Sequence, residues 1–387
     1  MRIAVIGGGP GGLYFAALVK QVAPGHEVVL WERGEAEDAI GFGVVFSDGA
    51  LGGVQAADPV LFDSVIDRFV RWESVGVRYR GRTISHDGYR FSAVGRRSLL
   101  RLLRERCAHR GVELRFASAA PPLPVLRSEF DLVVAADGVG SATRSSRPEA
   151  FGTRLEPRDS RYLWMGTDRM FDELTFAVVE TPHGPLQVHA YPYAPGHSTF
   201  IVETTDRVLR AGGLEQPGRS PEDTARAVAA LLEADEGLLG GHRLICTGSR
   251  WGRFTSVRND RWSDGNAVLL GDAAHTTHFS IGSGTKLAME DAVALAMALT
   301  DNRDLPDALA AYEAERKPAV ERMQRVAEVS RDWFEHVDER IGLPPGEFTS
   351  HLLTRSGRIS HRDLPLLDRD HVERVRNWFA LTLATTS

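Results

Sequence analysis

The sequence predicts an α/β fold in which a parallel-sheet domain is interrupted by a β-rich domain and followed by a helical tail. The chain opens with a β-branched run at 2–6, six residues with five glycines, and a helical pattern at 13–22. From about 162 to 203 the pattern alternates, which is typical of antiparallel strands. Beyond residue 305 most segments are amphipathic with a helical period. These observations together predict the fold class.

The predicted domain bounds follow these changes of pattern. The parallel-sheet domain is discontinuous and is expected at residues 1–70, 95–155 and 252–345. The β-rich domain is expected at residues 71–94 and 156–251. The last segment, 346–387, is expected to be a helical tail.

The first elements form one right-handed parallel crossover. The strand at 2–6 is followed by the helix at 13–22, which Pro24 and Gly25 stop, and by a second apolar strand at 27–31. Further elements are expected from apolar periodicity. The strands are at 130–136, 174–181, 186–193, 198–205 and 266–270, and the helices at 98–109, 221–234, 285–299, 305–340 and 372–385.

Composition excludes several classes of protein. A net charge of −6 offers no basic field for nucleic acid or an anionic membrane. Cys107 and Cys246, the two cysteines, cannot form a metal cluster, so no metal site is predicted and a reducing compartment is expected. No signal peptide is visible, and no stretch reaches the ~20 apolar residues of a membrane span. We expect a cytoplasmic monomer or homodimer.

The glycines after the first strand predict a dinucleotide site. Gly7 permits the tight turn, Gly9 lets the backbone approach a diphosphate, and Gly12 lets helix and strand pack closely. The helix N-terminus then faces the diphosphate with free N–H groups. Glu32 ends the second strand, twenty residues past Gly12, where an acid binds ribose hydroxyls. Arg33 is expected to contact adenosine, or to be solvated.

Two later segments favour FAD over NAD. Asp272 follows a buried strand, where it can accept hydrogen bonds from a polyol such as the ribityl chain of FAD. The helix that starts soon after it would place free N–H groups against the flavin pyrimidine edge. The residues expected there are Gly282, Ser283, Gly284 and Thr285. Taken alone, either segment has a simpler interpretation without a binding role, as part of an ordinary strand, loop and helix cap.

Residues 7–12, Asp137-Gly138 with Ser141 and Arg144, and residues 271–275 together resemble the flavoprotein aromatic hydroxylases of the para-hydroxybenzoate hydroxylase type. The resemblance extends to about residue 345. It implies a Rossmann-like FAD-binding domain with no second dinucleotide domain for NADH or NADPH. It also implies that Asp137 touches both flavin and the transient NAD(P)H, and that Arg96 binds FAD.

Within that family, four segments of the chain match one branch more closely than the others. Residues 41–48, 189–191, 198–203 and 278–286 resemble the salicylyl-CoA 5-hydroxylase and anthraniloyl-CoA monooxygenase branch, and a violacein-pathway hydroxylase carries similar segments. Val45 in the first segment is expected at the cofactor. The chain departs from the wider family at His278-Phe279, where two prolines are common, and at Lys286, where asparagine is usual.

The resemblance implies a monooxygenase reaction. NAD(P)H reduces FAD, the reduced flavin binds O₂, and a flavin hydroperoxide hydroxylates or epoxidises an aromatic ring. The predicted substrate is an aryl-CoA thioester such as salicylyl-CoA. A free aromatic or indolic natural-product intermediate is the alternative. A non-oxygenase flavin reductase, a halogenase and a flavin-binding protein without activity are further alternatives, although the W-x-W-x-I-P segment of halogenases is absent.

Four residues are candidates for catalysis or substrate contact, namely His189, Tyr191, His278 and Phe279. His278 could hydrogen-bond a ring hydroxyl or the peroxide, or be a satisfied loop residue. Phe279 is expected to be a lid over the substrate. His189, Tyr191 and Tyr193 share one strand face by their period of two and form either a packing stripe or the substrate wall.

Five charged residues carry weaker predictions. His275 is as readily structural as catalytic, and Lys286 either binds an anion or is solvated. Arg78, Arg80 and Arg82 alternate on one predicted strand, where they could bind a CoA moiety or form a solvated face.

Overall fold

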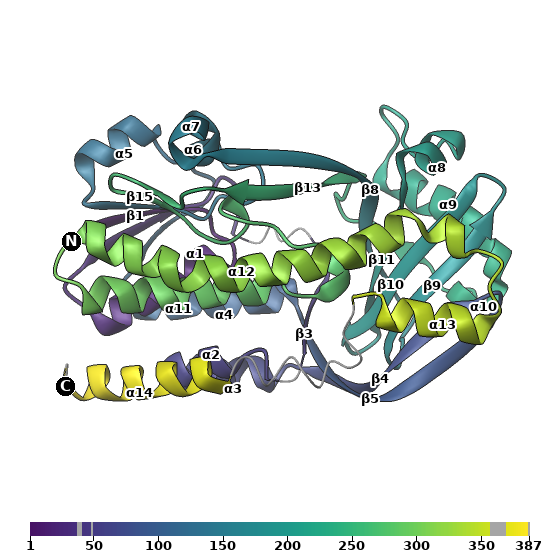
Figure 1. Cartoon of the computed structure of the whole chain (residues 1–387), viewed down its shortest axis with the longest axis horizontal. Coiled ribbons are helices and arrows are strands. Elements are labelled where there is room, and N and C mark those ends of the chain that lie inside the picture. The colour runs from purple at the N-terminus through teal and green to yellow at the C-terminus, as the bar shows by residue number, and fades with distance from the viewer. Residues whose placement is uncertain (37–40, 48, 357–368, 386–387) are drawn as a thin grey trace.

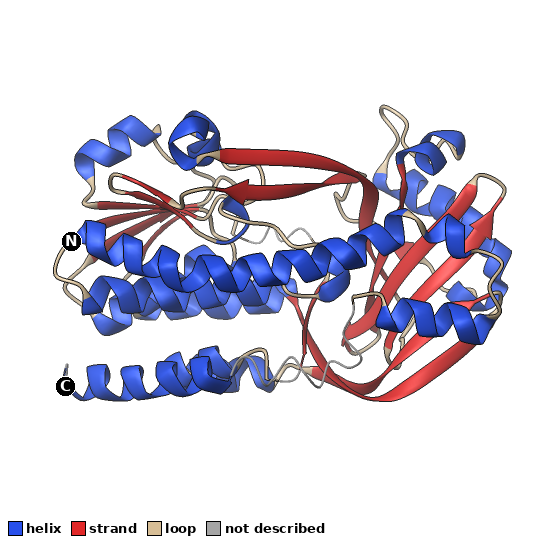
Figure 2. Cartoon of the chain, viewed as in Figure 1, coloured by secondary structure: helices blue, strands red, loops and turns tan. Residues whose placement is uncertain are grey.

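Two β-sheets assembled from strands far apart in the sequence organise this protein (Figure 1). The computed structural model describes residues 1–36, 41–47, 49–356 and 369–385. Asp48 and the part of the predicted tail at 357–368 lie outside the described residues. The predicted fold class is confirmed, because a parallel-sheet domain, a curled β domain and flanking helices are all present (Figure 2).

The first sheet has six strands in the order β14-β15-β7-β1-β2-β6, all parallel except β14. Its central strand, β1, pairs Ile3 with Val28 of β2 and with Leu132 of β7. Helices cover both faces of such a sheet, which is why its strands are nearly continuous apolar runs. The strand bounds are β1 Arg2–Ile6, β2 Glu27–Trp31, β6 Glu113–Arg115, β7 Leu132–Ala135, β14 Ser263–Asp264 and β15 Ala267–Leu269.

Two long helices pack against each other beside this sheet, α1 (Pro10–Val22) and α11 (Gly284–Asp301). Helix α12 (Leu305–Glu335) lies on α11 and continues to the second sheet, so that it joins the two halves of the molecule (Figure 1). The other helices near the first sheet are α2 Gly52–Ala57, α3 Pro59–Ile66, α4 Arg96–His109, α5 Leu123–Glu129, α6 Ala142–Ser146, α7 Pro148–Phe151 and α14 Arg369–Thr385.

The second sheet has nine strands in the order β12-β8-β11-β10-β9-β4-β5-β3, with β13 also paired to β8. All pairs are antiparallel except β4 with β9. The predicted alternating segments become β9 Leu174–Thr181, β10 Gly184–Ala194 and β11 His197–Thr205. The remaining strands are β3 Gly43–Ser47, β4 Val70–Tyr79, β5 Arg82–Gly95, β8 Thr153–Thr167, β12 Leu244–Ile245 and β13 Gly252–Asn259.

Short helices surround this second sheet. They are α8 Asp206–Ala211, α9 Pro221–Leu232, α10 Glu236–Leu239 and α13 Pro345–Thr354, with 3₁₀ turns at Glu233–Asp235, Gly271–Ala273, Phe279–Ile281 and Val337–Arg340. None of the helices in the described ranges combines the length and the apolar character that crossing a bilayer requires.

The prediction of a single strand through Arg78, Arg80 and Arg82 is wrong. Arg78 lies one residue before the end of β4, and Arg82 begins β5. Arg80 lies in the turn between the two strands with a φ of 50° and is followed by Gly81 with a φ of 71°. Gly81 favours a left-handed turn here, but the alternation of arginines around it had suggested one continuous strand. Arg78 pairs with Asp235.

The domain division stays a proposal. Strands β4 and β5 join β8 to β11 in one sheet, which supports a β-rich domain made of two separate segments. Strands β3 and β13 also belong to this sheet, although they lie within the segments predicted for the parallel-sheet domain.

Candidate active site

The turn between β1 and α1 is built around three glycines with different surroundings. Gly7 has a φ of 108°, and a Cβ there would lie 2.2 Å from the carbonyl oxygen of Ala136. A Cβ at Gly12 would lie 2.2 Å from the carbonyl oxygen of Gly7. Gly9, the N-cap of α1, has nothing within 4 Å of its Cβ position. The turn is thus closely packed on two sides and open at Gly9, the position at which a diphosphate needs access to the backbone.

Glu32 holds this turn in place at the end of β2. Its Oε2 accepts a hydrogen bond from the Gly8 backbone N–H (2.7 Å), and its Oε1 accepts one from Gly34 (2.9 Å). Each carboxylate oxygen retains a further lone pair that could accept from a ribose hydroxyl. Arg33 next to it is exposed.

A hollow begins at the glycine turn and continues toward the second sheet. Arg96, Asp272, Gly284 and Thr285 line it together with Gly9. Of these, all except Gly9 also line a larger cavity, of about 250 Å³, that reaches strands of the nine-stranded sheet. The two spaces therefore adjoin each other along these four residues and together mark a path from the glycine turn toward the second sheet.

Asp272 lies at the junction of these two spaces. Its side chain is exposed to the hollow rather than packed, yet the surrounding protein makes its environment poorly solvated. This desolvation raises the pKa of Asp272, against the lowering influence of His275 and Arg96. The same desolvation lowers the pKa of Arg96, and Asp272 opposes it. The pair presents a hydrogen-bond acceptor and a donor group to the path.

The N-terminus of α11 forms the next part of the wall. Gly282 has a φ of 61°, and Ser283, the N-cap, makes no side-chain bond to the helix because its Oγ lies 2.9 Å from Thr277 Oγ1. The first backbone N–H groups of this helix of 18 residues therefore have no capping side chain, and they form the positive end of the helix dipole. All four predicted residues from Gly282 to Thr285 line the cavity.

Asp137 follows β7 and caps a short helix. Its Oδ2 accepts from the N–H groups of Ala142 (2.9 Å) and Thr143 (3.3 Å), and its buried Oδ1 has no partner within the described part of the chain. Asp137 is not among the described residues that line either space. Its predicted contact with flavin and NAD(P)H stays a prediction.

The part of the cavity against the second sheet has aromatic walls. The Phe279 ring lies 5.2 Å from that of Tyr162 and 5.3 Å from that of His189. Tyr191 donates its hydroxyl hydrogen to the Gly43 carbonyl oxygen (2.9 Å), and burial raises the pKa of Tyr191. Three of the four catalytic candidates, Phe279, His189 and Tyr191, therefore line one cavity, and Val45 lines it too.

His278 lies behind Phe279, with the two rings 4.2 Å apart. It is buried, and the described residues that line the main cavity do not include it. Its Nε2 is 3.1 Å from Glu203 Oε1, and its Nδ1 is 2.8 Å from Ser280 Oγ. Its predicted contact with the substrate stays a prediction, whereas the contacts in hand are those of a positioning residue.

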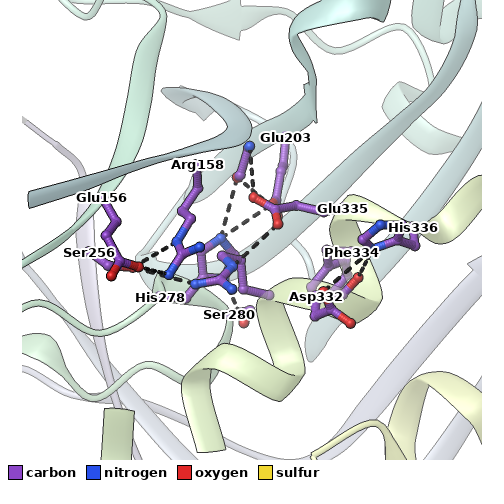
Figure 3. A network of polar contacts seen from close by, with 12 residues as sticks. Glu156, Arg158, Glu203, Ser256, His278, Ser280, Asp332, Phe334, Glu335 and His336 are labelled. Carbon is purple, nitrogen blue, oxygen red and sulfur yellow. Dashed lines mark hydrogen bonds and ion pairs between the residues drawn. The ribbon is translucent and has the colours of Figure 1, made fainter. Parts of the chain in front are cut away.

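Glu203 of β11 is the centre of a buried polar network, part of which Figure 3 shows. Only 1% of the residue is exposed. Oε1 accepts from Ser160 Oγ (2.6 Å) as well as from His278, and Oε2 lies 2.9 Å from His189 Nε2. Burial by itself would raise the pKa of Glu203, but the two histidines outweigh it and hold the pKa well below its usual value. The carboxylate is therefore charged at neutral pH.

The network continues from His278 to the C-terminal part of the chain. Ser280 Oγ lies 2.8 Å from Ser330 Oγ of α12, and Ser330 Oγ accepts from Arg355 Nε (2.8 Å). All of these hydrogen bonds can form at once if each group donates a hydrogen to the next. The order is then Arg355, Ser330, Ser280, His278 and Glu203. The chain of bonds therefore joins the loop before α11 to the residue that follows α13.

Arg355 lines the cavity and was missed by the sequence analysis. It lies in the segment expected only to be a helical tail, and no motif around it carries a signal. Glu203 did carry one, since it is an acid directly after the apolar residues Phe200, Ile201 and Val202, but the sequence analysis assigned it no role. His275 and Lys286 have carboxylate partners, Asp291 at 2.7 Å and Glu290 at 3.4 Å.

Comparison with known proteins gives one family and consistent relatives. A family model described as an FAD binding domain matches residues 126–327. The salicyloyl-CoA 5-hydroxylase of a Streptomyces species is 43% identical, over 98% of this chain and 74% of that protein. The 3-hydroxy-4-methyl-anthranilyl-(aryl-carrier protein) 5-monooxygenase of Streptosporangium sibiricum is also 43% identical, over 94% and 97% of the two chains.

A solved structure shares the fold. The tetrameric form of 2-methyl-3-hydroxypyridine-5-carboxylic acid oxygenase superposes with a TM-score of 0.69 at 20% identity, over 92% of this chain and 95% of the other. At this identity the likeness concerns the fold.

Proposed function

This chain belongs to the FAD-dependent aromatic monooxygenases, and from that membership we propose that it hydroxylates an electron-rich ring carried as a coenzyme A thioester. The observation that carries the proposal is the path of two adjoining spaces from the Gly9 turn, past Asp272 and the start of α11, to an aromatic-walled cavity. Its two ends suit a dinucleotide and an apolar ring. The two relatives that are 43% identical are named for aryl thioesters, which supports the thioester.

The residues present fit FAD. Gly9 leaves the backbone open where a Cβ would stand, Asp272 offers an acceptor at the middle of the path, and the helix N-terminus at Gly284 suits the negative charge of a reduced flavin ring. When bound, FAD supplies the redox and oxygen chemistry, with NADH or NADPH as the proposed reductant. The residues that would hold it are Gly7, Gly9, Gly12, Glu32, Arg33, Val45, Arg96, Asp137, Asp272, Gly282, Ser283, Gly284 and Thr285.

The chain's own contribution is orientation and the exclusion of water. Phe279, Tyr162 and Tyr191 surround the place for the ring with apolar surface, so a substrate there displaces solvent. His189 and Arg355 are two of the polar groups on the same cavity, and they could direct one face or substituent of the ring.

We expect the purified enzyme to hydroxylate salicylyl-CoA at least about tenfold faster than free salicylate, because binding energy from a remote CoA group can be used to orient the ring. NADH oxidation and the hydroxylated product would be measured together, with and without O₂. Equal rates with both substrates would favour the free aromatic alternative. NADH oxidation that reduces the substrate without O₂ would favour the reductase.

We expect Asp272→Leu to weaken FAD binding by about 10- to 100-fold, since hydrogen bonds to a charged acceptor contribute about 1.5–3 kcal/mol. Because desolvation raises the pKa of Asp272, the surrounding protein disfavours its charged form, and the variant should unfold no more easily than wild type. Asp87→Leu, on the exposed part of β5, is the matched control. Unchanged FAD affinity in Asp272→Leu would place the cofactor elsewhere.

Cellular location and assembly are proposed from weaker observations. Cys107 and Cys246 are both free and buried, which supports a reducing compartment such as the cytoplasm. We propose a monomer or homodimer, to be measured by sedimentation of the FAD-bound protein.

A further inference from the structure

The turn at residues 271–275, which presents Asp272 to the binding path, packs directly against helix α11. Gly271 at its start has a φ of 61°, and a Cβ there would lie 3.1 Å from the Ala288 Cβ of that helix. The backbone N–H of His275 at its end donates to the Gly271 carbonyl oxygen (2.9 Å). The turn is therefore closed on itself, so a shift of Gly271 carries Asp272 with it.

Asp291 of α11 holds this turn from behind. Its Oδ2 accepts from the Gly271 backbone N–H (3.2 Å) and lies 2.7 Å from His275 Nε2. One carboxylate oxygen thus binds both ends of the turn, and Asp291 is fully buried. The side chains of Arg144 and Asn259 bond to carbonyl oxygens in the later part of the turn. Within the described part of the chain, Asp291 is the residue whose side chain binds the start of the turn.

The same face of α11 also lines the binding path. Gly284, Ala288 and Asp291 are four and three residues apart in this helix, so they share one face. Gly284 and Ala288 line the hollow that begins at the glycine turn. About 10 Å of helix separates Gly284 from Asp291. The carboxylate therefore fixes the turn of Asp272 to the helix whose N-terminus lines the path.

Arg316 of α12 keeps Asp291 ionised and in place. Its Nε lies 2.8 Å from Asp291 Oδ1, the oxygen that the turn does not use, and its guanidinium also pairs with Glu290 (2.9 Å). Burial by itself would raise the pKa of Asp291, but His275 and Arg316 outweigh it and hold the pKa below its usual value. Hydrogen bonds to a charged acceptor are stronger than those to a neutral one. Asp291 therefore holds the turn with charge-assisted bonds.

We propose that Asp291 is a positioning residue for Asp272, which it holds where Asp272 accepts hydrogen bonds from the ribityl chain of FAD. This inference rests on the proposed function, because it requires the proposed contact between Asp272 and FAD. Tuning through charge would act in the opposite direction. Desolvation is the main cause that raises the pKa of Asp272, and the negative charge of Asp291 raises it further. Removal of that charge favours the ionised Asp272, which is the better acceptor, so a loss of FAD affinity reports position.

The test compares FAD affinity with thermal stability in the full-length, FAD-bound protein. The fluorescence of flavin released on dilution gives the affinity and needs no turnover. We expect Asp291→Ala to weaken FAD binding at least about fivefold. Arg316→Met breaks the same buried ion pair but leaves both bonds to the turn, so it should lower thermal stability comparably while FAD affinity stays within about threefold of wild type. Asp301→Ala, at the exposed C-terminal end of α11, is the control and should bind FAD like wild type.

A double variant shows whether Asp291 acts through Asp272. Asp272→Leu removes the acceptor, so the position of the turn no longer matters to the ribityl chain. We expect Asp272→Leu/Asp291→Ala to bind FAD within about twofold of Asp272→Leu alone, whereas independent effects would multiply. His275→Phe retains a ring against Trp262 (5.0 Å) and removes one of the two bonds to Asp291. It takes the place of Asp291→Ala should that variant not fold, with a smaller loss of affinity that is again absent beside Asp272→Leu.

Three results would overturn this inference and leave the proposed function standing. They are an Asp291→Ala protein that binds FAD like wild type, losses that multiply in the double variant, and an Arg316→Met protein that loses FAD as strongly as Asp291→Ala. Unchanged FAD affinity in Asp272→Leu is a different failure, since it contradicts the proposed placement of the cofactor and this inference with it.

Discussion

Gly9→Ala is expected to leave the protein folded but to abolish most of its FAD binding, whereas Gly12→Ala should lower both the stability of the protein and its FAD binding. A Cβ at Gly9 meets no protein atom within 4 Å, and the backbone there is extended, with φ −73° and ψ 175°. The added methyl group therefore occupies only the space that a diphosphate needs. A Cβ at Gly12 lies 2.2 Å from the Gly7 carbonyl oxygen, so α1 must move away from β1.

The two effects are separated by measuring FAD affinity and thermal unfolding of the apoprotein. For Gly9→Ala we expect FAD affinity to fall at least about tenfold, with a stability change of about 1 kcal/mol or less from the altered N-cap. For Gly12→Ala we expect a loss of about 1–3 kcal/mol or more. Gly25→Ala, which also has nothing within 4 Å, is the control. Gly9→Ala protein that binds FAD like wild type would contradict the placement of the diphosphate.

Glu203→Leu should be the most destabilising single change in the second sheet. It removes a buried carboxylate from Ser160, His189 and His278 and leaves their polar atoms without an acceptor. Breaking such a network costs about 3–5 kcal/mol. Glu203→Gln, which retains shape and one acceptor oxygen, should cost less. Glu180→Leu, which breaks an exposed pair with Arg80, should change stability by about 0.5 kcal/mol at most.

The same network predicts how stability depends on pH. The folded-state pKa of Glu203 is below its unfolded value, so its contribution is present above about pH 4.3 and is lost as the pH falls through the folded value. Burial lowers the pKa of His189, so the unfolded chain takes up a proton first, and stability also falls below about pH 6.5. Both effects destabilise the protein in acid. Urea unfolding at about pH 7.5 and 5.5 would measure the His189 effect, and a further series at about pH 3.5 would measure the Glu203 effect. Stability that rises on acidification would contradict this assignment.

The elements with regular periodicity were predictable. The helix expected at 285–299 is α11, Gly284–Asp301, and the strand expected at 174–181 is β9 with the same bounds. In both cases apolar period and flanking turn residues act over a few neighbours, so they can be recognised without the rest of the chain. The hairpin of β4 and β5 was not predicted, because its turn at Arg80-Gly81 lies within an arginine-rich run.

The sequence by itself determined the dinucleotide end of this protein and the family to which it belongs. Gly7, Gly9, Gly12 and Glu32 lie within one βαβ unit, so their spacing along the chain already implies their arrangement in space. The substrate end was decided only by the tertiary structure. His189 and Glu203 come from neighbouring strands, His278 from a loop, and Arg355 from beyond the long helix α12. No local rule relates such positions, because the packing of α12 and α13 on the second sheet is what brings their side chains together.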